Sequence, residues 1–440
     1  RCLDFDDVLL LSVNEGTLPQ TPNDNSFIPY MLRKAFGLTT PERRTAVYAY
    51  YFYRLVQRAR RLRMTFNSSA EGLSSGEMSR FMTQLRVDRN LPIVDLALRV
   101  DLDSLLHTPA AVDKPRDLVE RLYRRDAEGH VKGAHPSLSP SAINTYLRCP
   151  LRFYYEYVCN YRMPQPTPDD GIQPNLLGTI FHAAAQAVYE RVVSDHRGTP
   201  PPGYLEALAR RPKTGEPSPL HPYIVQAFAN ENFEPEQLPV LEASVVEMYL
   251  RILLEDDARL DELQVCELER WHEMHLPLPE GLGASHVTIG GIMDRLDRVT
   301  HDGRRLWRIV DYKTGGDPET ADSVAQLFEV RGGKHRHYML QTFIYAEILR
   351  RELAPDASSI APALYFVHRA RGKNGFSPYL KMGKGKEKSE VVDFAEQVPD
   401  FAERLTQLVG EILDPARSFE PLTGDEKTCK VCPFYALCYR

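Results

Sequence analysis

The sequence predicts an α/β protein organised in two blocks. In the first block, an apolar run at 8–13 and an alternating run at 62–66 flank a long helix. In the second block, a helix, three consecutive strands, another helix and a fourth strand follow one another. Strands and helices in this order are typical of a sheet covered by helices.

The composition is that of an ordinary globular protein. The chain has 440 residues, enough for two or three domains, and is 43% hydrophobic and 26% charged. It contains no run of about 18 apolar residues, so we expect no membrane span. The net charge of −6 gives no overall attraction to nucleic acid, but arginines gather locally at 54–63.

The first block covers residues 1–90. The continuous apolar run Val8–Val13 predicts a strand buried on both faces, and Leu62–Phe66 predicts a second strand. Pro41 lies in the first turn of the helix between them. The helix carries apolar side chains on one side, at Tyr48, Tyr51, Phe52, Leu55 and Val56. Because the chain opens at Arg1 without an initiator methionine or a signal peptide, we expect a fragment of a longer protein.

Residues 91–136 are punctuated by prolines and predict a linker with some helix. A second domain, 137–440, begins near Ser139, an N-cap residue followed by proline. Its periodicity predicts helices at 176–193, 241–260, 337–351 and 391–413, and strands at 265–278, 287–299, 305–313 and 363–367. The Pro-rich stretches 164–174 and 196–240 predict loops.

The turn between two of these strands is the most informative part of the sequence. Asp302-Gly303 predicts a two-residue type I′ turn. The register of such a hairpin places Asp294 directly opposite Asp311, with Lys313 on the same face two residues further on.

Two facing carboxylates repel each other unless a cation lies between them. Asp294 and Asp311 therefore predict a site for Mg²⁺ or Mn²⁺, and the Lys313 ammonium beside it could stabilise charge on a scissile phosphate. The alternative is an ordinary solvated strand pair in which Lys313 bridges the two carboxylates. Glu267 and Glu269 on the preceding strand could extend this acidic site, but we favour their interpretation as exposed strand carboxylates.

Four of the seven cysteines have the spacing of metal ligands. Cys429, Cys432 and Cys438 crowd the end of the chain, and Cys149 lies 280 residues before the first of them. Four thiolates suit either Zn²⁺ or a [4Fe–4S] cluster, and spacing alone does not separate the two. Cys159 is the rival to Cys149 as the remote ligand.

The motifs of the second domain resemble the PD-(D/E)xK nuclease core, and more narrowly its RecB-type branch. The Asp294, Asp311-x-Lys313 hairpin carries the resemblance, with Met293 at the position of the name-giving proline. Gly178-x-x-x-His182 upstream matches the branch's G-x-x-x-H pattern, and Gln341-x-x-x-Tyr345 downstream matches its Q-x-x-x-Y pattern.

This resemblance implies a role for each matching residue. His182, Asp294 and Asp311 would ligate the metal ion together with the Tyr312 carbonyl. Lys313 would be the catalytic lysine, and Gln341 and Tyr345 would support the site or contact DNA. The cysteine spacing resembles the iron–sulfur staple of AddB-type nucleases, which implies a structural [4Fe–4S] cluster held by Cys149, Cys429, Cys432 and Cys438.

The first block resembles two motifs of UvrD-like helicases. Residues 3–19 are similar to motif V, and residues 53–60 are similar to motif VI, in which the arginine at the Arg58 position acts on the ATP γ-phosphate. The chain contains no G-x-x-x-x-G-K-[ST] loop, so we expect no ATP hydrolysis from it.

Together, the resemblances imply the C-terminal part of an AddB-like subunit of a bacterial, cytoplasmic helicase–nuclease. The expected activity is Mg²⁺-dependent exonuclease cleavage of single strands at duplex DNA ends, beside an AddA-like partner. A non-catalytic DNA-binding scaffold with a nuclease-like fold is the alternative. A zinc-stabilised RNA nuclease is a third possibility.

Overall fold

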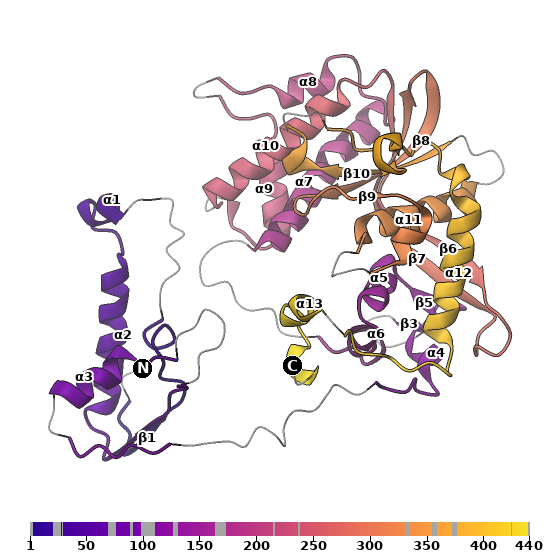
Figure 1. Cartoon of the computed structure of the whole chain (residues 1–440). Helices are drawn as coiled ribbons and strands as arrows, with labels where there is room; N and C mark the ends of the chain where they lie inside the picture. Colours follow the sequence, from indigo (N-terminus) through magenta and orange to yellow (C-terminus); the bar gives the residue numbers. More distant parts are fainter. Residues whose placement is uncertain are drawn as a thin grey trace. The chain divides into compact units, whose positions relative to one another are not determined.

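The structure is a computed structural model. It describes residues 3–20, 28, 30–68, 76–88, 91–97, 111–125, 131–162, 173–213, 216–235, 238–330, 335–353, 359–371, 376–423 and 425–438. The chain divides into two compact units, residues 1–102 and residues 103–440, which are described separately below (Figure 1). Among the described residues, no helix combines the length and the apolar character needed to cross a membrane.

The described residues of the first unit form a small parallel sheet and three helices. Its elements are β1 (Asp7–Leu10), α1 (Tyr30–Ala35), α2 (Pro41–Val56), β2 (Arg61–Met64) and α3 (Arg80–Asp88). β1 pairs with β2 in parallel. The core of this unit is built on Phe52, Phe81 and Leu85, with Tyr48 and Val56 of α2 packed against it. Tyr51, expected on the same side, is exposed.

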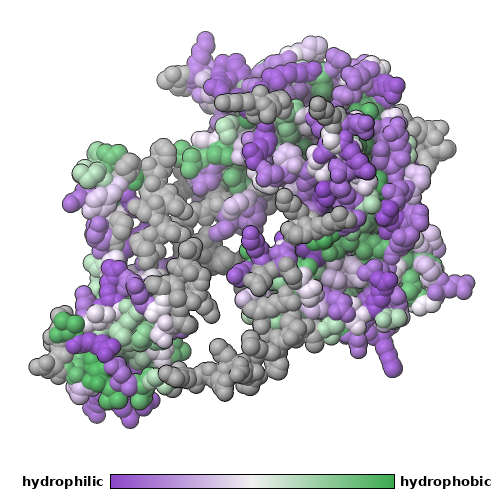
Figure 2. Space-filling view, in the orientation of Figure 1, coloured by the Kyte–Doolittle hydropathy of each residue, from purple (hydrophilic) through white to green (hydrophobic). Residues whose placement is uncertain are grey.

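The strand predicted at Val8–Val13 is shorter and less buried than expected. β1 ends at Leu10, and Leu9 and Leu11 are 61% and 67% exposed. The prediction was wrong because β1 pairs only with β2 among the described residues and is covered on one face. Figure 2 shows hydrophobic side chains at the surface of this unit.

The second unit contains most of the regular structure. Its longer helices are α5 (Pro140–Arg148), α7 (Pro174–His196), α9 (His221–Asn230), α10 (Val240–Asp257), α11 (His337–Leu353) and α12 (Val398–Leu413). Its shorter helices are α4 (Leu118–Arg121), α6 (Pro150–Phe153), α8 (Tyr204–Ala209) and α13 (Glu426–Lys430).

One mixed sheet organises this unit. Its strands are β5 (Ser137–Leu138), β6 (Leu263–Pro277), β7 (His286–His301), β8 (Arg304–Lys313) and β10 (Ile360–Phe366). The long β7 pairs antiparallel with β6 on one side and β8 on the other, and β10 runs parallel to β8. The short β5 pairs with the beginning of β7. Outside this sheet lie the two-residue strands β3 (Arg124–Arg125), β4 (Val131–Lys132), β9 (Thr320–Ala321), β11 (Lys381–Met382) and β12 (Ser389–Glu390).

The sheet separates two hydrophobic cores. Buried residues of α5, α11 and α12 form one core with the sheet. Buried residues of α7, α8, α9 and α10 form the other. The order helix, three strands, helix, strand predicted for the second domain is therefore present, and Figure 1 shows the two groups of helices on either side of the strands.

Three segments differ from the sequence-based expectations. Residues 111–125, expected in a linker, pack onto the second unit: Leu118 and Leu122 are buried in its core, and the Lys114 ammonium donates a hydrogen bond to the Glu411 carbonyl. The loop expected at 196–240 contains α8 and α9, and the helix expected from residue 391 begins at Val398. Most of the Pro-rich stretch 164–174 lies outside the described residues.

Candidate metal centre

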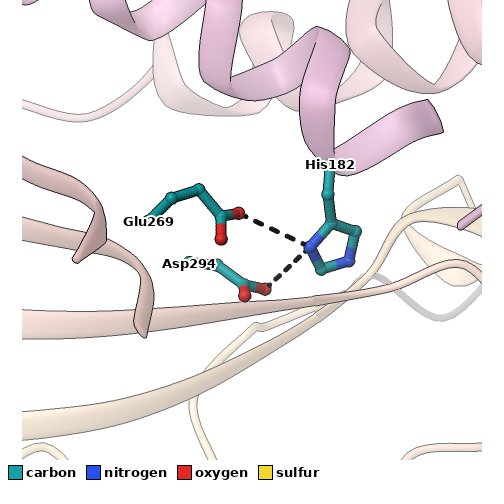
Figure 3. Close-up of side chains that lie close together, drawn as sticks. All are labelled: His182, Glu269 and Asp294. Carbon is teal, nitrogen blue, oxygen red and sulfur yellow. Dashed lines mark ion pairs between the residues drawn. The ribbon is translucent and has the colours of Figure 1, made fainter. Parts of the chain in front are cut away.

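His182 comes from α7 and points at the sheet (Figure 3). Its Nδ1 lies 3.3 Å from Asp294 Oδ2 and 3.8 Å from Glu269 Oε1. Its Nε2 donates a hydrogen bond of 3.1 Å to the Tyr312 carbonyl, which can only accept. A histidine that donates one ring N–H to a carbonyl keeps the other nitrogen oriented for an ion.

Gly178 explains how α7 comes so close to the end of β8. A Cβ at this position would lie 3.1 Å from Thr314 Oγ1, directly after Lys313. This contact is tighter than ordinary side-chain packing, so a larger residue would require the Thr314 side chain to move by a few tenths of an ångström. The glycine and the histidine of the G-x-x-x-H pattern thus act together, one turn apart on the same helix.

Three carboxylates lie in one row across the sheet. In the β7–β8 hairpin, His301 pairs with Arg304 and Arg295 pairs with Val310, so the next positions, Asp294 and Asp311, lie opposite each other. Asp302 and Gly303 both have positive φ, as the predicted type I′ turn requires. On the other side of β7, Glu269 occupies the equivalent position on β6, because Leu268 pairs with Arg295 and Arg270 pairs with Met293.

Asp311 and Lys313 form a close pair at one end of this row. Lys313 Nζ lies 2.6 Å from Asp311 Oδ2. Burial raises the pKa of Asp311 to about 6, with Asp294 acting in the same direction and Lys313 opposing it. Burial alone would lower the pKa of Lys313, but the Asp311 carboxylate outweighs it and raises that pKa, so the ammonium stays charged.

At the other end of the row, Asp294 and Glu269 favour the charged form of His182. Burial would lower the pKa of His182, but Asp294 and Glu269 outweigh burial and raise it to about 10. Asp294 also accepts a hydrogen bond of 2.8 Å from the Tyr312 backbone N–H, which fixes its carboxylate. Nδ1 of His182 and single oxygens of Glu269 and Asp294 all lie within 4.8 Å of one another.

These donors suit a divalent cation. The group combines carboxylate oxygens with an imidazole nitrogen, and carboxylate-rich sites fit Mg²⁺ or Mn²⁺. His182 would hold the ion through Nδ1 beside Asp294 and Glu269, with the Asp311 carboxylate next in the row. The Tyr312 carbonyl, expected among the ligands, here accepts the His182 hydrogen bond.

Glu269 belongs to this group, against the favoured expectation of an exposed strand carboxylate. Of the two alternatives for this residue, the structure supports the extended acidic site, because Glu269 lies beside His182 and Asp294. Glu267 lies elsewhere, 2.7 Å from Arg270 and 2.8 Å from His272.

Gln341 and Tyr345 support the strand that carries Asp294. The two side chains share one face of α11, and Gln341 Nε2 donates to the Tyr345 hydroxyl at 3.4 Å. Tyr345 is buried and packs against β7 where a Cβ at Gly291 would lie 3.0 Å from its ring. The glycine before the acid therefore makes room for this tyrosine.

A buried ionic cluster lies behind the site. Arg295, next to Asp294, is 1% exposed and lies 2.8 Å from Asp257 and 3.1 Å from Asp297. Arg308 contacts the same two acids. The Arg295 guanidinium also stacks over Tyr189 of α7. Such a network holds α7, α10 and the sheet in one arrangement, because each buried charge needs its partners.

The four cysteines of the predicted ligand set line one pocket. Cys149 lies between α5 and α6, and Cys429, Cys432 and Cys438 lie in and after α13. Tyr155 and Phe434 line the same pocket with their rings 5.5 Å apart. Cys159, the rival ligand, does not line this pocket. Two segments far apart in sequence therefore bring these thiols to one place.

The comparisons with known proteins agree with this geometry. The model of the PD-(D/E)XK nuclease superfamily matches residues 137–439, most of the second unit. The chain belongs to this superfamily. Its members are generally metal-dependent nucleases, which fits the acidic site and the α/β architecture. A search of curated proteins finds no match.

Proposed function

We propose that this protein is a Mg²⁺-dependent deoxyribonuclease that hydrolyses phosphodiester bonds of DNA single strands. One observation carries the proposal: α7, β6 and β7 bring His182, Glu269 and Asp294 within 4.8 Å of one another, beside the Asp311–Lys313 pair of β8. A purely structural fold has no physical reason to gather carboxylates that repel each other.

Each residue has a task in this reaction. His182, Glu269, Asp294 and Asp311 would hold the divalent cation, which supplies a polarised phosphate and an acidified water when bound. The Lys313 ammonium, held by Asp311, stabilises charge on the scissile phosphate or orients the attacking water. Gln341 and Tyr345 keep β7 and α11 in place behind Asp294.

The wider role follows from the sequence resemblance. We propose that the chain is an AddB-like part of a bacterial helicase–nuclease that processes duplex DNA ends with an AddA-like partner. The first unit supports this proposal in one respect: Arg58 of the motif VI resemblance lies 2.7 Å from Asp4 of the motif V resemblance. The four cysteines would hold a structural [4Fe–4S] cluster, with Zn²⁺ as the alternative.

Cleavage of end-labelled single-stranded DNA by the full chain tests the proposal. With Mg²⁺ we expect cleavage by the wild type, none in EDTA, and a loss of at least about a hundredfold in kcat in Lys313→Ala. Arg404→Ala on α12, a partly exposed arginine paired with Asp400, is the control and should cleave like the wild type. If Lys313→Ala cleaved as well as the wild type, the assigned chemistry would be refuted. If the wild type and the variants all bound DNA but none cleaved it, the DNA-binding scaffold would be favoured.

A further inference from the structure

A groove of about 740 Å³ opens beside the Asp311–Lys313 pair. It lies between α5, the segment 316–320 and the start of α11. Gln341 of the Q-x-x-x-Y pattern lines it, and the ring of Tyr338, which also lines it, lies 5.0 Å from Lys313 Nζ. The groove therefore lies next to the place where we propose that the phosphodiester bond is cut.

Positive charge lines this groove. Arg148, Arg152 and Arg336 all face it. Arg148 is half-buried and forms no direct ion pair within the described part of the chain, although its charge helps to lower the pKa of Asp425. Arg152 is paired with Glu156 at 3.0 Å. Arg336 uses its Nε for the Thr320 carbonyl, which orients the rest of its guanidinium without neutralising it. Planar guanidinium groups of this kind suit phosphate oxygens.

The acids of the groove are already engaged. Asp317 pairs with Arg369, and Glu319 accepts a hydrogen bond of 3.0 Å from the Met339 backbone N–H at the start of α11. Glu319 also lies 3.3 Å from His337 Nδ1. These two carboxylates are thus occupied by partners other than Arg148.

Aromatic rings lie between the arginines and the catalytic lysine. The rings of His337 and Tyr338 are 3.9 Å apart, and both line the groove. An aromatic face combined with arginines along one path is the arrangement by which proteins bind single-stranded nucleic acid, with bases on the rings and phosphates on the cations.

We infer that this groove binds the segment of the DNA single strand that adjoins the scissile bond. Arg148 and Arg336 contact its phosphates, and Tyr338 stacks with a base. The inference rests on the proposed nuclease function and adds the path of the substrate to it. Arg152 lines both this groove and the cysteine pocket, so the groove adjoins the cysteines.

Binding of fluorescein-labelled oligothymidylate to the full chain in EDTA, where cleavage is excluded, tests the inference by fluorescence anisotropy. We expect Arg148→Ala to weaken binding about fivefold and to reduce the slope of log Kd against log salt by about one. Arg148→Lys keeps the charge and should restore most of the affinity. Arg404→Ala is the matched control.

A second variant leaves the arginines untouched. Ser141 is exposed, lines the groove and occupies the first turn of α5, where an acidic residue favours the helix. Ser141→Glu should therefore fold and yet weaken oligothymidylate binding through charge repulsion. Ser244→Glu on α10, also exposed, is its control.

The outcomes separate this inference from the proposed function. If the wild type binds and cleaves DNA while Arg148→Ala and Ser141→Glu bind like the wild type, the groove assignment is wrong and the nuclease assignment stands. If the wild type neither binds nor cleaves, both are wrong. Weaker oligothymidylate binding by Arg148→Ala and Ser141→Glu, with unchanged binding by both controls, supports the assignment of the groove as the binding site.

Discussion

At the level of single residues, Glu269 shows that the register between β6 and β7 was not predictable from the sequence. The partner of Asp294 on β8 was predictable because a two-residue turn fixes the hairpin register. β6 and β7 are joined by residues 278–285, and a register shift lies between Val265 and Glu267. A loop of this length and a bulge leave the register open, so the alternation of the sequence did not identify Glu269.

Replacing Glu269 by glutamine tests its place in the site. Glu269→Gln removes one of the carboxylates around His182 and should weaken binding of Mn²⁺ by at least about tenfold, measured by calorimetry. Glu267→Gln, two residues earlier on the same strand, is the matched control because Glu267 pairs with Arg270 and His272 instead. Equal Mn²⁺ affinity in Glu269→Gln and the wild type would show that Glu269 is not a ligand of this site.

At the scale of elements, the long periodic segments were the predictable ones. β6, β7, β8, β10, α7 and α11 all lie within a few residues of their expected bounds. The short helices α8 and α9 were missed because prolines at their flanks suggested loops. Residues 111–125 were assigned to a linker because their partners lie far away in the sequence. Lys114, for example, donates to Glu411, almost 300 residues later, and such a contact leaves no local pattern in the sequence.

Helix α11 depends on a buried carboxyl group from another segment. Glu319 accepts the Met339 N–H near the start of the helix. Burial raises the pKa of Glu319 to about 7, against the opposing effects of the Met339 and Tyr338 N–H groups, Arg336 and Lys313. Because the folded state holds this proton more tightly than the unfolded chain, the stability that it contributes is complete below about pH 4.5 and is lost as pH rises through about 7.

Glu319→Gln should therefore change stability in a pH-dependent way. Glutamine stays neutral, so relative to the wild type the variant gains free energy of unfolding between about pH 4.5 and 7, on the order of 3 kcal/mol. Urea unfolding at several pH values measures this difference. The same substitution at Glu403, exposed on α12, is the control. A pH-independent difference between Glu319→Gln and the wild type would contradict the assigned titration.

At the scale of the whole molecule, the cysteine pocket joins distant parts of the second unit. Cys149 precedes the strands β6, β7, β8 and β10, and the other three cysteines follow them. A metal centre at these thiols would close a loop of 280 residues, which removes roughly 5 kcal/mol of entropy from the unfolded chain. The position of this pocket favours a structural role.

Cys432→Ala should lose the metal centre and with it stability. We expect a colourless protein with a lower Tm and faster proteolysis, whereas Cys159→Ala, outside the pocket, should keep the metal and the Tm of the wild type. Metal analysis and visible absorbance of the wild type distinguish the two metals. One equivalent of zinc without broad visible absorbance would contradict the [4Fe–4S] assignment.

In this description of the molecule, α7 and the sheet together form a site for one divalent cation. Anomalous scattering from a crystal soaked in Mn²⁺ is the most direct test of that site. We expect a manganese peak bound by His182 Nδ1 and by the carboxylates of Glu269, Asp294 and Asp311. A well-ordered His182 with no manganese next to it, or manganese bound only elsewhere on the molecule, would contradict the account.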